Sequence, residues 1–563
     1  MNASPDHSDR QSLRVMMDLA VCFVITVCML RGFFLEGYLV STGSMAPVLL
    51  GFHKRVNCPT CEHAFAFGVR FDESVVERSP SAQSTPTGEA YVTCPNCGQV
   101  NIDISTVPRN HGDQLLVHKH IFDLRSPHRW EPVVFRNQSG PSEAYVKRVV
   151  GLAGEELHVV AGDIYIDGQI VRKSFETQVD MRIPVSDLSH VPDDDDWELP
   201  WQLDGGWDVI NGQMTTVTDD PSDSEVEYSI TLRPWRWSGG RHLVEVPLSK
   251  EDAMPDWSDF ARRYNQIPIS WTTRLAWDED TERLSCEGVM PAEMQHDLMR
   301  SANSDGFRRA VYRLAALSHM APVTDRYGYN SVAMSAENFV RDLMLDAELE
   351  LDEFPTDITL HIPIVGETVA VSIEPRSGRV VAMMGGQQEI LREGQLPTGG
   401  RRLHIQASNF DRRLVLAVNG ELVFAPIDFP GEQPSAADPM APPTAEETYE
   451  YLQAQSQLGV TVTSGCCRLS GLRLFRDVYY TRGRARYGID AAVRIPAGHY
   501  FVLGDNSPVS FDSRSWQQPF VPHRLLVGKP FVVHLPSRPG VLSLGGRELT
   551  IRLPDFHRIR YIP

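Results

Sequence analysis

The first strong pattern along the chain is an apolar run near the N-terminus. Residues 19–30 read LAVCFVITVCML without a charge, and after Arg31 the apolar character continues with GFFL. A helix of roughly 20 apolar residues spans a bilayer, and an arginine near one end can extend toward the headgroups. The alternatives are a buried helix of a soluble protein and a cleavable signal peptide, for which an Ala-x-Ala-like site is missing after the run. The pattern favours a retained single anchor, whose orientation the flanking basic residues do not decide.

A period of two dominates the second half of the chain. Short segments rich in β-branched residues alternate with turns at residues 225–232, 357–364, 402–406, 413–418 and 421–424. Asn419-Gly420, between the last two segments, is the strongest short signal for a hairpin. Regular strands of this kind predict a two-sheet antiparallel sandwich. The stretch looks like a concanavalin-like jelly roll, with residues 472–479 as its closing strand.

Apolar spacing typical of a helix interrupts these strands and predicts short helices at residues 292–300, 307–317 and 337–345. Four tryptophans also lie in or before this region: Trp201, Trp207, Trp235 and Trp237. Tryptophans that stack on sugar rings would make the sandwich a glycan-binding module, but isolated tryptophans more often fill cores. We therefore favour a spacer or a protein-contact domain over a lectin.

Charge separates the chain into two kinds of region. The 563 residues carry a formal net charge of −20, which argues against a general nucleic-acid binder, because phosphates require a basic face. With 42% hydrophobic and 22% charged residues, the chain is neither wholly disordered nor a multi-span membrane protein. Residues 176–485 hold 50 Asp and Glu against 27 Lys and Arg, a net charge of −23, whereas the remainder holds 23 against 26, a net charge of +3. The sequence therefore predicts an acidic insert within a near-neutral body.

Four of the nine cysteines form two CxxC pairs, Cys58-Pro-Thr-Cys61 and Cys94-Pro-Asn-Cys97. Two such turns present four thiolates that can surround one tetrahedral ion, so the spacing predicts a zinc ribbon. Two disulfides are the alternative if the segment is exported to an oxidising space. Four cysteine ligands leave no open coordination position, so this zinc would be structural. The middle of the spacer, residues 77–89, is rich in Ser, Thr and Pro and is expected to be a mobile excursion.

Three short segments carry candidate chemistry. Ser44 stands between glycine and methionine in the constrained turn STGSMAP, directly after the apolar run. Lys147 lies in the strand-like stretch AYVKRVVGL, where strand alternation turns one of the two adjacent cations toward the packed side. Farther along, an apolar strand runs into Gly504-Asp505-Asn506, a strand-to-turn signal. Each segment alone has a plain structural explanation as a loop, a solvated strand lysine or a turn.

Together and in this order, the three segments resemble the type I signal peptidases, membrane-bound serine proteases that remove signal peptides from exported proteins. The resemblance covers residues 12–57, 112–175 and 486–535, and with so large a β insert the chain is similar to signal peptidases of planctomycete-type bacteria. It implies an all-β catalytic core and no cofactor for catalysis. It also implies preprotein signal peptides and the lipid bilayer as partners, and a place in the cell membrane with the catalytic domain on the extracytoplasmic side.

The same resemblance implies roles for individual residues. Ser44 corresponds to the nucleophile and Lys147 to its general base, while the Thr42 hydroxyl and the Ser44 backbone N–H correspond to the oxyanion hole. Ser510 falls where the family has a serine that orients the lysine. Supporting positions are Gly504, Asp505, Asp512 and Arg514. The chain departs from the family at residues 507–509, where Ser-Pro-Val replaces Arg-Asp-Asn; the loss of a charged pair puts the local salt-bridge network in doubt.

The chemistry of the two main candidates supports the same assignment. A serine hydroxyl is a poor nucleophile at neutral pH and needs an adjacent base. A lysine can be that base only if desolvation lowers its pKa from about 10.4 toward neutrality. The valines around Lys147, together with Met45, could supply the apolar pocket. No His-Asp pair in family-like spacing accompanies Ser44, so a Ser-His-Asp triad is disfavoured.

These patterns divide the chain into a tail and anchor at 1–40, a first catalytic part at 41–175 with the zinc ribbon at 56–100, the acidic insert at 176–485, and a second catalytic part at 486–563. Because the motif segments lie outside residues 180–484, a short linker in place of that stretch is expected to leave peptide cleavage largely intact. The alternative function is a non-catalytic glycan-binding or adhesion protein on a decayed protease scaffold. A glycan or a protein is then the ligand class expected for the insert.

Overall fold

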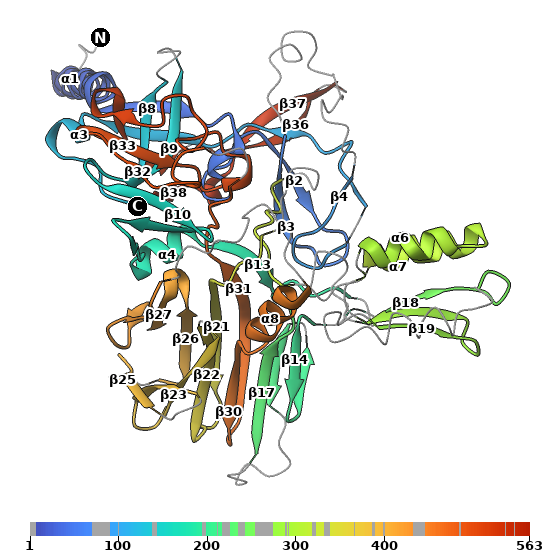
Figure 1. Ribbon diagram of the computed structural model, residues 1–563. Coiled ribbons are helices and arrows are strands. Elements are labelled where there is room, and N and C mark those ends of the chain that lie inside the picture. Colours follow the sequence, from blue (N-terminus) through green and yellow to red (C-terminus); the bar gives the residue numbers. More distant parts are fainter. Residues whose placement is uncertain are drawn as a thin grey trace, which may run out of the picture.

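The computed structural model confirms a mainly β chain, built from two large β bodies and a smaller arm that projects to one side (Figure 1). The structure describes residues 7–69, 91–99, 101–137, 143–193, 197, 199–210, 212–216, 226–234, 243–253, 274–287, 290, 292–317, 322–330, 338–364, 366–385, 389–397, 400–431, 445–482, 486–534, 536–544 and 547–562.

The first body contains an antiparallel sheet with the strand order β1-β7-β35-β8-β9-β33-β34, and β38 pairs with β35. Its strands are β1 (Leu35–Leu39), β7 (Gln114–Lys119), β8 (Pro132–Arg136), β9 (Ala144–Gly151), β33 (His499–Leu503), β34 (Val521–Pro522), β35 (Leu526–Val533) and β38 (Arg560–Tyr561). Strands from both sides of the acidic insert alternate in this sheet, so that Leu503 pairs with Arg148. The pairing places the end of β33 beside the lysine strand.

A second sheet of four strands adjoins the first. Its strands are β12 (Gln169–Ile170), β11 (Asp163–Ile166), β10 (Glu156–Val160) and β32 (Val493–Arg494). The two sheets share an apolar core in which Leu157 and Ile164 pack with Val150 and Phe501. Short helical turns complete this body: α3 (Ile121–Leu124), η5 (Ser507–Val509), η6 (His523–Leu525) and η7 (Phe556–Arg558).

The cysteine region lies beside this body. It contains β2 (His53–Asn57), β3 (Ala64–Gly68), β6 (Arg109–Asn110), β4 (Tyr91–Val92) and β5 (Ile102–Asp103), and the hairpin of β36 (Ser537–Leu544) and β37 (Arg547–Pro554) lies close to β6. The four CxxC cysteines are buried in a small apolar cluster with Val56 and Ile104. The excursion predicted at residues 77–89 lies outside the described residues.

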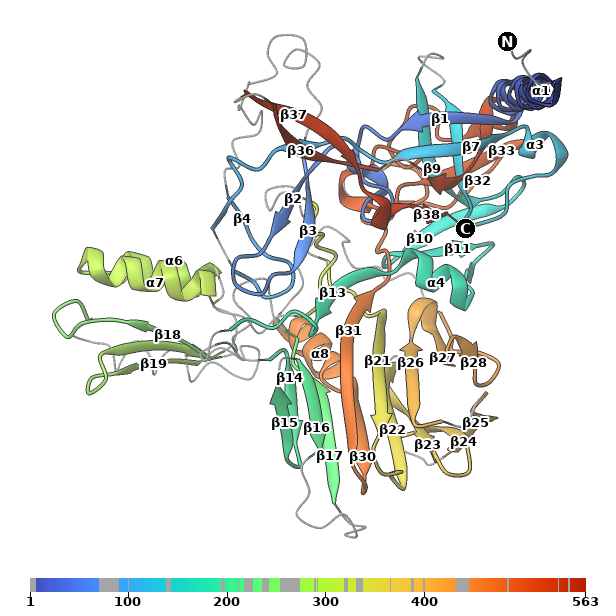
Figure 2. The same ribbon diagram turned by 180° about the vertical axis from the view of Figure 1, so that it is seen from behind.

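The second large body is a sandwich of two antiparallel sheets, seen from behind in Figure 2, which confirms the predicted two-sheet insert. One sheet contains β15 (Trp207–Ile210), β16 (Gln213–Thr216), β31 (Cys467–Arg476), β21 (Leu343–Leu351), β26 (Arg402–Ser408), β27 (Arg413–Val418), β28 (Glu421–Leu422), β13 (Ile183–Asp187) and β29 (Ile427–Asp428). The other contains β14 (Trp201–Asp204), β17 (Glu227–Leu232), β30 (Gly459–Thr463), β22 (Asp357–Ile364), β23 (Glu367–Ile373), β24 (Arg379–Met384) and β25 (Glu389–Gln395).

The sandwich core consists of apolar residues from both sheets. Trp201 is buried in this core and Trp207 packs against it, whereas Trp235 and Trp237 lie outside the described residues. Asn419 and Gly420 both have positive φ angles, of 53° and 83°, in the predicted hairpin turn. Helices α4 (Phe175–Met181) and α8 (Ala445–Gln455) and the turn η4 (Phe410–Arg412) accompany the sheets.

The side arm is a separate small body within the insert. Strands β18 (Leu243–Pro247), β20 (Arg283–Glu287) and β19 (Arg274–Asp278) form its sheet, and α6 (Ala292–Ser301) and α7 (Asp305–Leu317) pack on it. These two helices were predicted from their apolar spacing. The helix predicted at residues 337–345 is wrong, because β21 begins at Leu343. Phe339 forms a β-bridge with Thr324, Val340 is buried, and both faces of β21 are covered from Leu343 on, so extended chain buries the apolar positions that were spaced like those of a helix.

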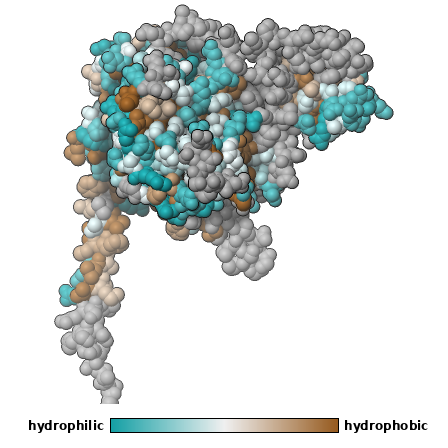
Figure 3. All heavy atoms as spheres, turned by 90° about the horizontal axis from the view of Figure 1, so that it is seen from below, coloured by the Kyte–Doolittle hydropathy of each residue, from teal (hydrophilic) through white to brown (hydrophobic). Residues whose placement is uncertain are grey.

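At the N-terminus, α1 (His7–Met29) continues into the wide turn η1 (Leu30–Phe34). Residues 14–34 form the one segment of the described chain that is long and apolar enough to cross a membrane, with a mean hydropathy of 2.0 and none of it buried. Figure 3 shows this apolar helix as a column that extends away from the rest of the molecule. The element therefore has the length and the exposed surface that were expected of the N-terminal run.

Candidate active site

The turn that carries Ser44 is a single 3-10 turn, η2 (Gly43–Met45), between β1 and β2. Met45 is fully buried, and Leu49 N donates to Met45 O at 2.7 Å, so the chain folds back on itself directly after the serine. Ser44 itself is 8% exposed. Thr42 precedes the turn and is exposed, with its hydroxyl oxygen 3.4 Å from Ser44 Oγ. The turn thus holds one hydroxyl in the protein and keeps a second one beside it at the surface.

Lys147 reaches Ser44 from the middle of β9. Its Nζ is in direct hydrogen-bond contact with Ser44 Oγ, and its side chain is 5% exposed. Burial lowers the pKa of Lys147 from 10.5 to about 8, although Asp512 and Asp505 oppose this shift. A pKa of about 8 leaves an appreciable fraction of neutral amine near pH 7. The predicted nucleophile and the predicted base therefore meet, from segments 103 residues apart.

The neighbouring Arg148 is buried as well and makes a different contact. Alternate residues of a strand point to opposite sides. Arg148 Nε and Nη2 donate to the two carboxylate oxygens of Asp505 at 2.8 and 2.7 Å. Because a guanidinium stays charged, this pair neutralises the aspartate and fixes the end of β33 to β9.

A second buried ion pair lies just beyond. Arg514 Nε and Nη2 donate to Asp512 at 2.9 and 2.8 Å, and Asp512 Oδ2 accepts from Gly504 N at 3.1 Å. Although burial raises it, the Arg514 charge lowers the pKa of the Asp512 carboxyl overall. Gly504 also lies so close to Ser44 O and Ser510 that a Cβ would clash with both. This position therefore excludes any side chain.

The departure from the family at residues 507–509 does not remove the salt-bridge network. Arg514 Nη1 donates to Ser507 Oγ at 2.7 Å, and the same hydroxyl accepts from Thr481 N at 2.7 Å. The serine thus gives the guanidinium a neutral partner where the family has a charged residue. The network that the sequence put in doubt is present, with Asp512 as the carboxylate.

Ser510 is the predicted site residue whose contact differs from the expectation. Its Oγ is buried and faces the Asp512 carboxyl, whose pKa it helps to lower, and among the described residues no hydrogen bond joins it to Lys147. Ser510 instead follows the η5 turn, where its N donates to Ser507 O at 3.4 Å. The hydroxyl lies against the backbone of Gly504 rather than on the ammonium.

Sequence reasoning missed Asn506 as a site residue. Asn506 is fully buried; its N donates to Ser44 O at 3.0 Å and its Nδ2 donates to Gly43 O at 2.9 Å. Both bonds end on the nucleophile turn. Its position directly after Gly504-Asp505 was a usable signal, since small polar side chains in such turns bond to nearby backbone.

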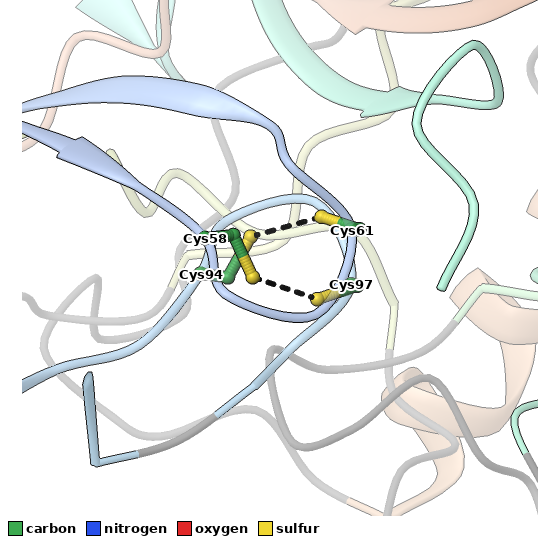
Figure 4. A group of neighbouring side chains, drawn as sticks. All are labelled: Cys58, Cys61, Cys94 and Cys97. Carbon is green, nitrogen blue, oxygen red and sulfur yellow. Dashed lines mark hydrogen bonds between the residues drawn. The ribbon is translucent and has the colours of Figure 1, made fainter. Parts of the chain in front are cut away.

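The four CxxC cysteines form the second cluster (Figure 4). The Sγ atoms of Cys58 and Cys97 lie 3.5 Å apart, and those of Cys61 and Cys94 lie 3.8 Å apart. A disulfide has an S–S length of about 2.05 Å, whereas four sulfurs at about 2.3 Å from one tetrahedral zinc ion lie about 3.8 Å from one another. Thr60 N and Asn96 N each donate to a cysteine sulfur at 3.4 Å. The donor set and its spacing therefore fit a zinc ion.

The family model described as "Signal peptidase, peptidase S26" matches residues 102–225 and 439–535. The chain carries a signal peptidase region. The match includes Lys147, Asp505 and Arg514 and begins after Ser44. It leaves the middle of the acidic insert, residues 226–438, unmatched. The signal peptidase region therefore flanks most of the sandwich.

Curated relatives agree with this assignment. Signal peptidase I of Pseudomonas fluorescens is 38% identical over 81 residues, which are 13% of this chain and 26% of that protein. The probable signal peptidase I-2 of Synechocystis sp. is 32% identical over 68 residues, 11% of this chain and 31% of that protein. Signal peptidase I of Leptolyngbya laminosa is 36% identical over 70 residues, 11% of this chain and 34% of that protein. The chain thus spans about a quarter to a third of the length of these relatives.

Solved structures match about a quarter of the chain, and only weakly. A carbohydrate binding module from Bacillus subtilis has 9% identity and a TM-score of 0.18, and the match covers 24% of this chain and 74% of that module. A galectin from Caenorhabditis elegans has 11% identity and a TM-score of 0.15, over 24% of this chain and 80% of the galectin. Scores this low carry no argument about the insert.

Proposed function

We propose that this protein is a membrane-anchored serine endopeptidase that removes signal peptides from exported preproteins, with Ser44 as nucleophile and Lys147 as general base. The observation that carries the proposal is the contact between Ser44 Oγ and a buried Lys147 Nζ of lowered pKa. The signal peptidase region around Lys147 supports the same reaction class.

In the proposed first step, the neutral amine of Lys147 takes the proton of Ser44 Oγ, and the oxygen attacks the carbonyl carbon of the scissile peptide bond. Ser44 N–H and the Thr42 hydroxyl donate to the oxygen that becomes negative. The ammonium of Lys147 then returns the proton to the leaving amine, and an ester forms between Ser44 and the signal peptide. Water, deprotonated by Lys147, hydrolyses this ester and restores the serine.

The segment Arg14–Phe34 would hold the catalytic body at the membrane surface. β1 follows this segment directly and leads into the nucleophile turn, so few residues separate the lipid from Ser44. Substrate and enzyme would then meet at the same surface, because a signal peptide is itself apolar. This geometry supports a cell-membrane location, and the extracytoplasmic side for the catalytic body follows from the proposed substrates, which are exported preproteins.

The four-cysteine cluster would hold one structural zinc ion, ligated by Cys58, Cys61, Cys94 and Cys97. Zinc would tie the two CxxC turns together and would take no part in peptide cleavage. Metal analysis of the purified chain should find about one zinc per chain, and Cys94→Ser should lose it. Four oxidised cysteines without metal would favour the disulfide alternative.

The function is tested with the full chain in detergent and a preprotein that carries a signal peptide. Wild type should release the mature protein with a single new N-terminus, read by mass spectrometry. Ser44→Ala should release none, while Ser408→Ala, a buried serine of the sandwich, should release the same product as wild type. Cleavage by Ser44→Ala, or no cleavage by wild type, would contradict the proposal and would favour the non-catalytic alternative.

A further inference from the structure

A segment of the insert reaches the nucleophile turn. Residues 322–330, here called the strap, leave the sandwich side of the molecule just before β21 and end at Tyr327-Gly328-Tyr329-Asn330 beside Ser44. The family match does not include them, since it stops at residue 225 and resumes at residue 439. The strap is therefore specific to the inserted part of this chain.

The base of the strap is fixed to the sandwich body. Thr324 forms a β-bridge with Phe339, and Val340 N donates to Val323 O at 2.9 Å. The buried Gln455 of α8 closes the pair: its Oε1 accepts from Val323 N at 2.8 Å and its Nε2 donates to Val340 O at 2.8 Å. The strap thus starts from a rigid, fully paired base.

The strap is also held part-way along. Arg476, at the end of β31, is 1% exposed and donates through Nη2 to Arg326 O at 2.8 Å. Its guanidinium lies 4.5 Å from the centre of the Tyr327 ring, within the range of a cation–π contact. A long sandwich strand therefore orients the first aromatic side chain of the tip.

The tip of the strap forms hydrogen bonds with the turn that follows β33. The Tyr327 hydroxyl donates to Asp505 O at 2.6 Å. Asn330 and Asn506 exchange two amide hydrogen bonds, at 2.7 and 2.8 Å. Asn506 in turn holds the backbone carbonyls of Gly43 and Ser44. Asn506 therefore links the strap to the turn that carries Ser44.

Tyr329 holds the nucleophile turn from its other side. Its hydroxyl donates to Phe52 O at 3.0 Å, and its carbonyl accepts from Gly68 N at 2.7 Å. A Cβ on Gly43 would clash with the Tyr329 ring, so this ring defines the space beside the nucleophile turn. The strap tip therefore contacts the nucleophile turn directly through Tyr329 and indirectly through Asn506.

From this chain of contacts we propose that Tyr327, Tyr329 and Asn330 are positioning residues of the active site, and that the insert is needed for full activity. The inference rests on the proposed function and extends it to residues beyond Ser44 and Lys147. Serine attack requires the reacting atoms to be about 3–3.5 Å apart and aligned, so a small shift of the turn lowers turnover. The strap therefore restricts the motion of the turn Gly43–Met45 and fixes the position of Ser44.

The expectation for an insert replaced by a linker changes accordingly. A linker across residues 180–484 would remove the strap together with the sandwich. Asn506 would lose its partner, and Gly43 would lose the ring beside it. Such a chain is therefore expected to cleave slowly, even though Ser44 and Lys147 lie outside the deleted stretch.

The test is Asn330→Ala in the full chain, with two readouts. Its kcat on a preprotein should fall about 10–100-fold while KM stays within about twofold, because ground-state binding is not involved. Hydrogen exchange in a peptide covering residues 41–50 should accelerate, since the amides of Ala46 and Leu49 report on the turn. Asn330→Gln, which keeps the amide, should recover part of both.

Ser408→Ala is the matched control, because it removes a buried hydrogen bond of 2.6 Å to Gln178 far along the chain from the strap. It should lower the melting temperature without changing kcat or the exchange of residues 41–50. Unchanged kcat and unchanged exchange in Asn330→Ala would overturn the inference, as would an equal loss of kcat in Ser408→Ala. If wild type cleaves no preprotein, the proposed function fails, while the exchange experiment still decides whether the strap holds the turn.

Discussion

Two buried lysines, one in the catalytic body and one where this body meets the sandwich, show how differently the same side chain can be used. Lys147 at the candidate active site and Lys173 at the junction with the sandwich are 5% and 2% exposed. Lys173 Nζ lies 2.6 Å from Asp411 and 2.7 Å from Asp477, and these carboxylates raise its pKa well above 10.5 in spite of burial. Lys147 has a serine hydroxyl instead, and burial lowers its pKa to about 8.

The difference lies in the nearest partner rather than in the depth of burial. A carboxylate in contact stabilises the ammonium form, whereas at Lys147 the desolvation cost is only partly offset, by the charges of Asp512 and Asp505. In the active-site region the nearby aspartates are already paired, Asp505 with Arg148 and Asp512 with Arg514. Each of these carboxylates is thus paired with an arginine, and neither forms an ion pair with Lys147. A lysine fixed as a cation is structural, and a lysine without a paired carboxylate can act as a base.

The different roles of the two lysines are tested most directly by removing each amine in turn. Lys147→Met should lower kcat/KM by on the order of 10⁴, because Ser44 then has no base. Lys147→Arg should be equally inactive, since a guanidinium does not deprotonate. Lys119→Met, which removes a lysine paired with Glu36 at the surface, is the control and should keep full activity. Peptide release under single-turnover conditions measures all three.

Lys173→Met should act on stability instead. Two buried carboxylates would lose their cation, at a cost of about 3–5 kcal/mol. The melting temperature should fall clearly, and the triple variant Lys173→Met, Asp411→Asn, Asp477→Asn should recover much of the loss. Thermal unfolding in detergent checks this; a Lys173→Met protein as stable as wild type would mean that the pair of carboxylates is not held by this lysine.

A third prediction tests whether the Thr42 hydroxyl takes part in the oxyanion hole beside Ser44 and Lys147. Thr42→Ala should lower kcat by on the order of 10²–10³, the usual effect of removing one oxyanion donor, with little change in KM. Thr42→Ser keeps the hydroxyl and should retain most of the turnover. Equal rates for Thr42→Ala and wild type would assign the threonine a structural role only.

The smallest effect concerns the stability cost of a buried amine. The folded pKa of about 8 lies below the value of 10.5, so the unfolded chain binds more protons between these pH values, and wild-type stability rises with pH there. Lys147→Met removes this penalty. It should be more stable than wild type by about 1–3 kcal/mol below pH 8, and the difference should shrink toward pH 10.5. A difference independent of pH would argue against a depressed pKa.

Much of this organisation could be predicted from the sequence, because it depends on local patterns. The two-sheet insert followed from period-two segments, and its Asn-Gly turn appears as predicted at Asn419-Gly420. The contact between Ser44 and Lys147 was implied by the family resemblance, since no spacing rule joins residues so far apart. The helix expected at residues 337–345 failed because a strand buried on both faces has no alternation.

The strap and the contacts that hold the site residues in place could not be predicted in the same way. Tyr327 and Asn330 lie in a stretch without a motif, and their function arises only where the fold brings them to Asp505 and Asn506. In the sequence, Ser507 stands for the loss of a charged residue. In the fold, its hydroxyl accepts a hydrogen bond from Arg514. Such contacts between distant segments are set by tertiary packing, which a single sequence does not display.

The central claim, that Lys147 is a neutral base in the folded protein, is tested most directly by the pH dependence of kcat/KM, which reports the free enzyme. The profile for preprotein cleavage should rise with pH through an apparent pKa of about 8, as Lys147 loses its proton. Thr42→Ser, which leaves Lys147 in place, should show the same limb at a similar rate. A rising limb near the histidine value of about 6.5, or a Lys147→Met enzyme with wild-type activity, would contradict the account.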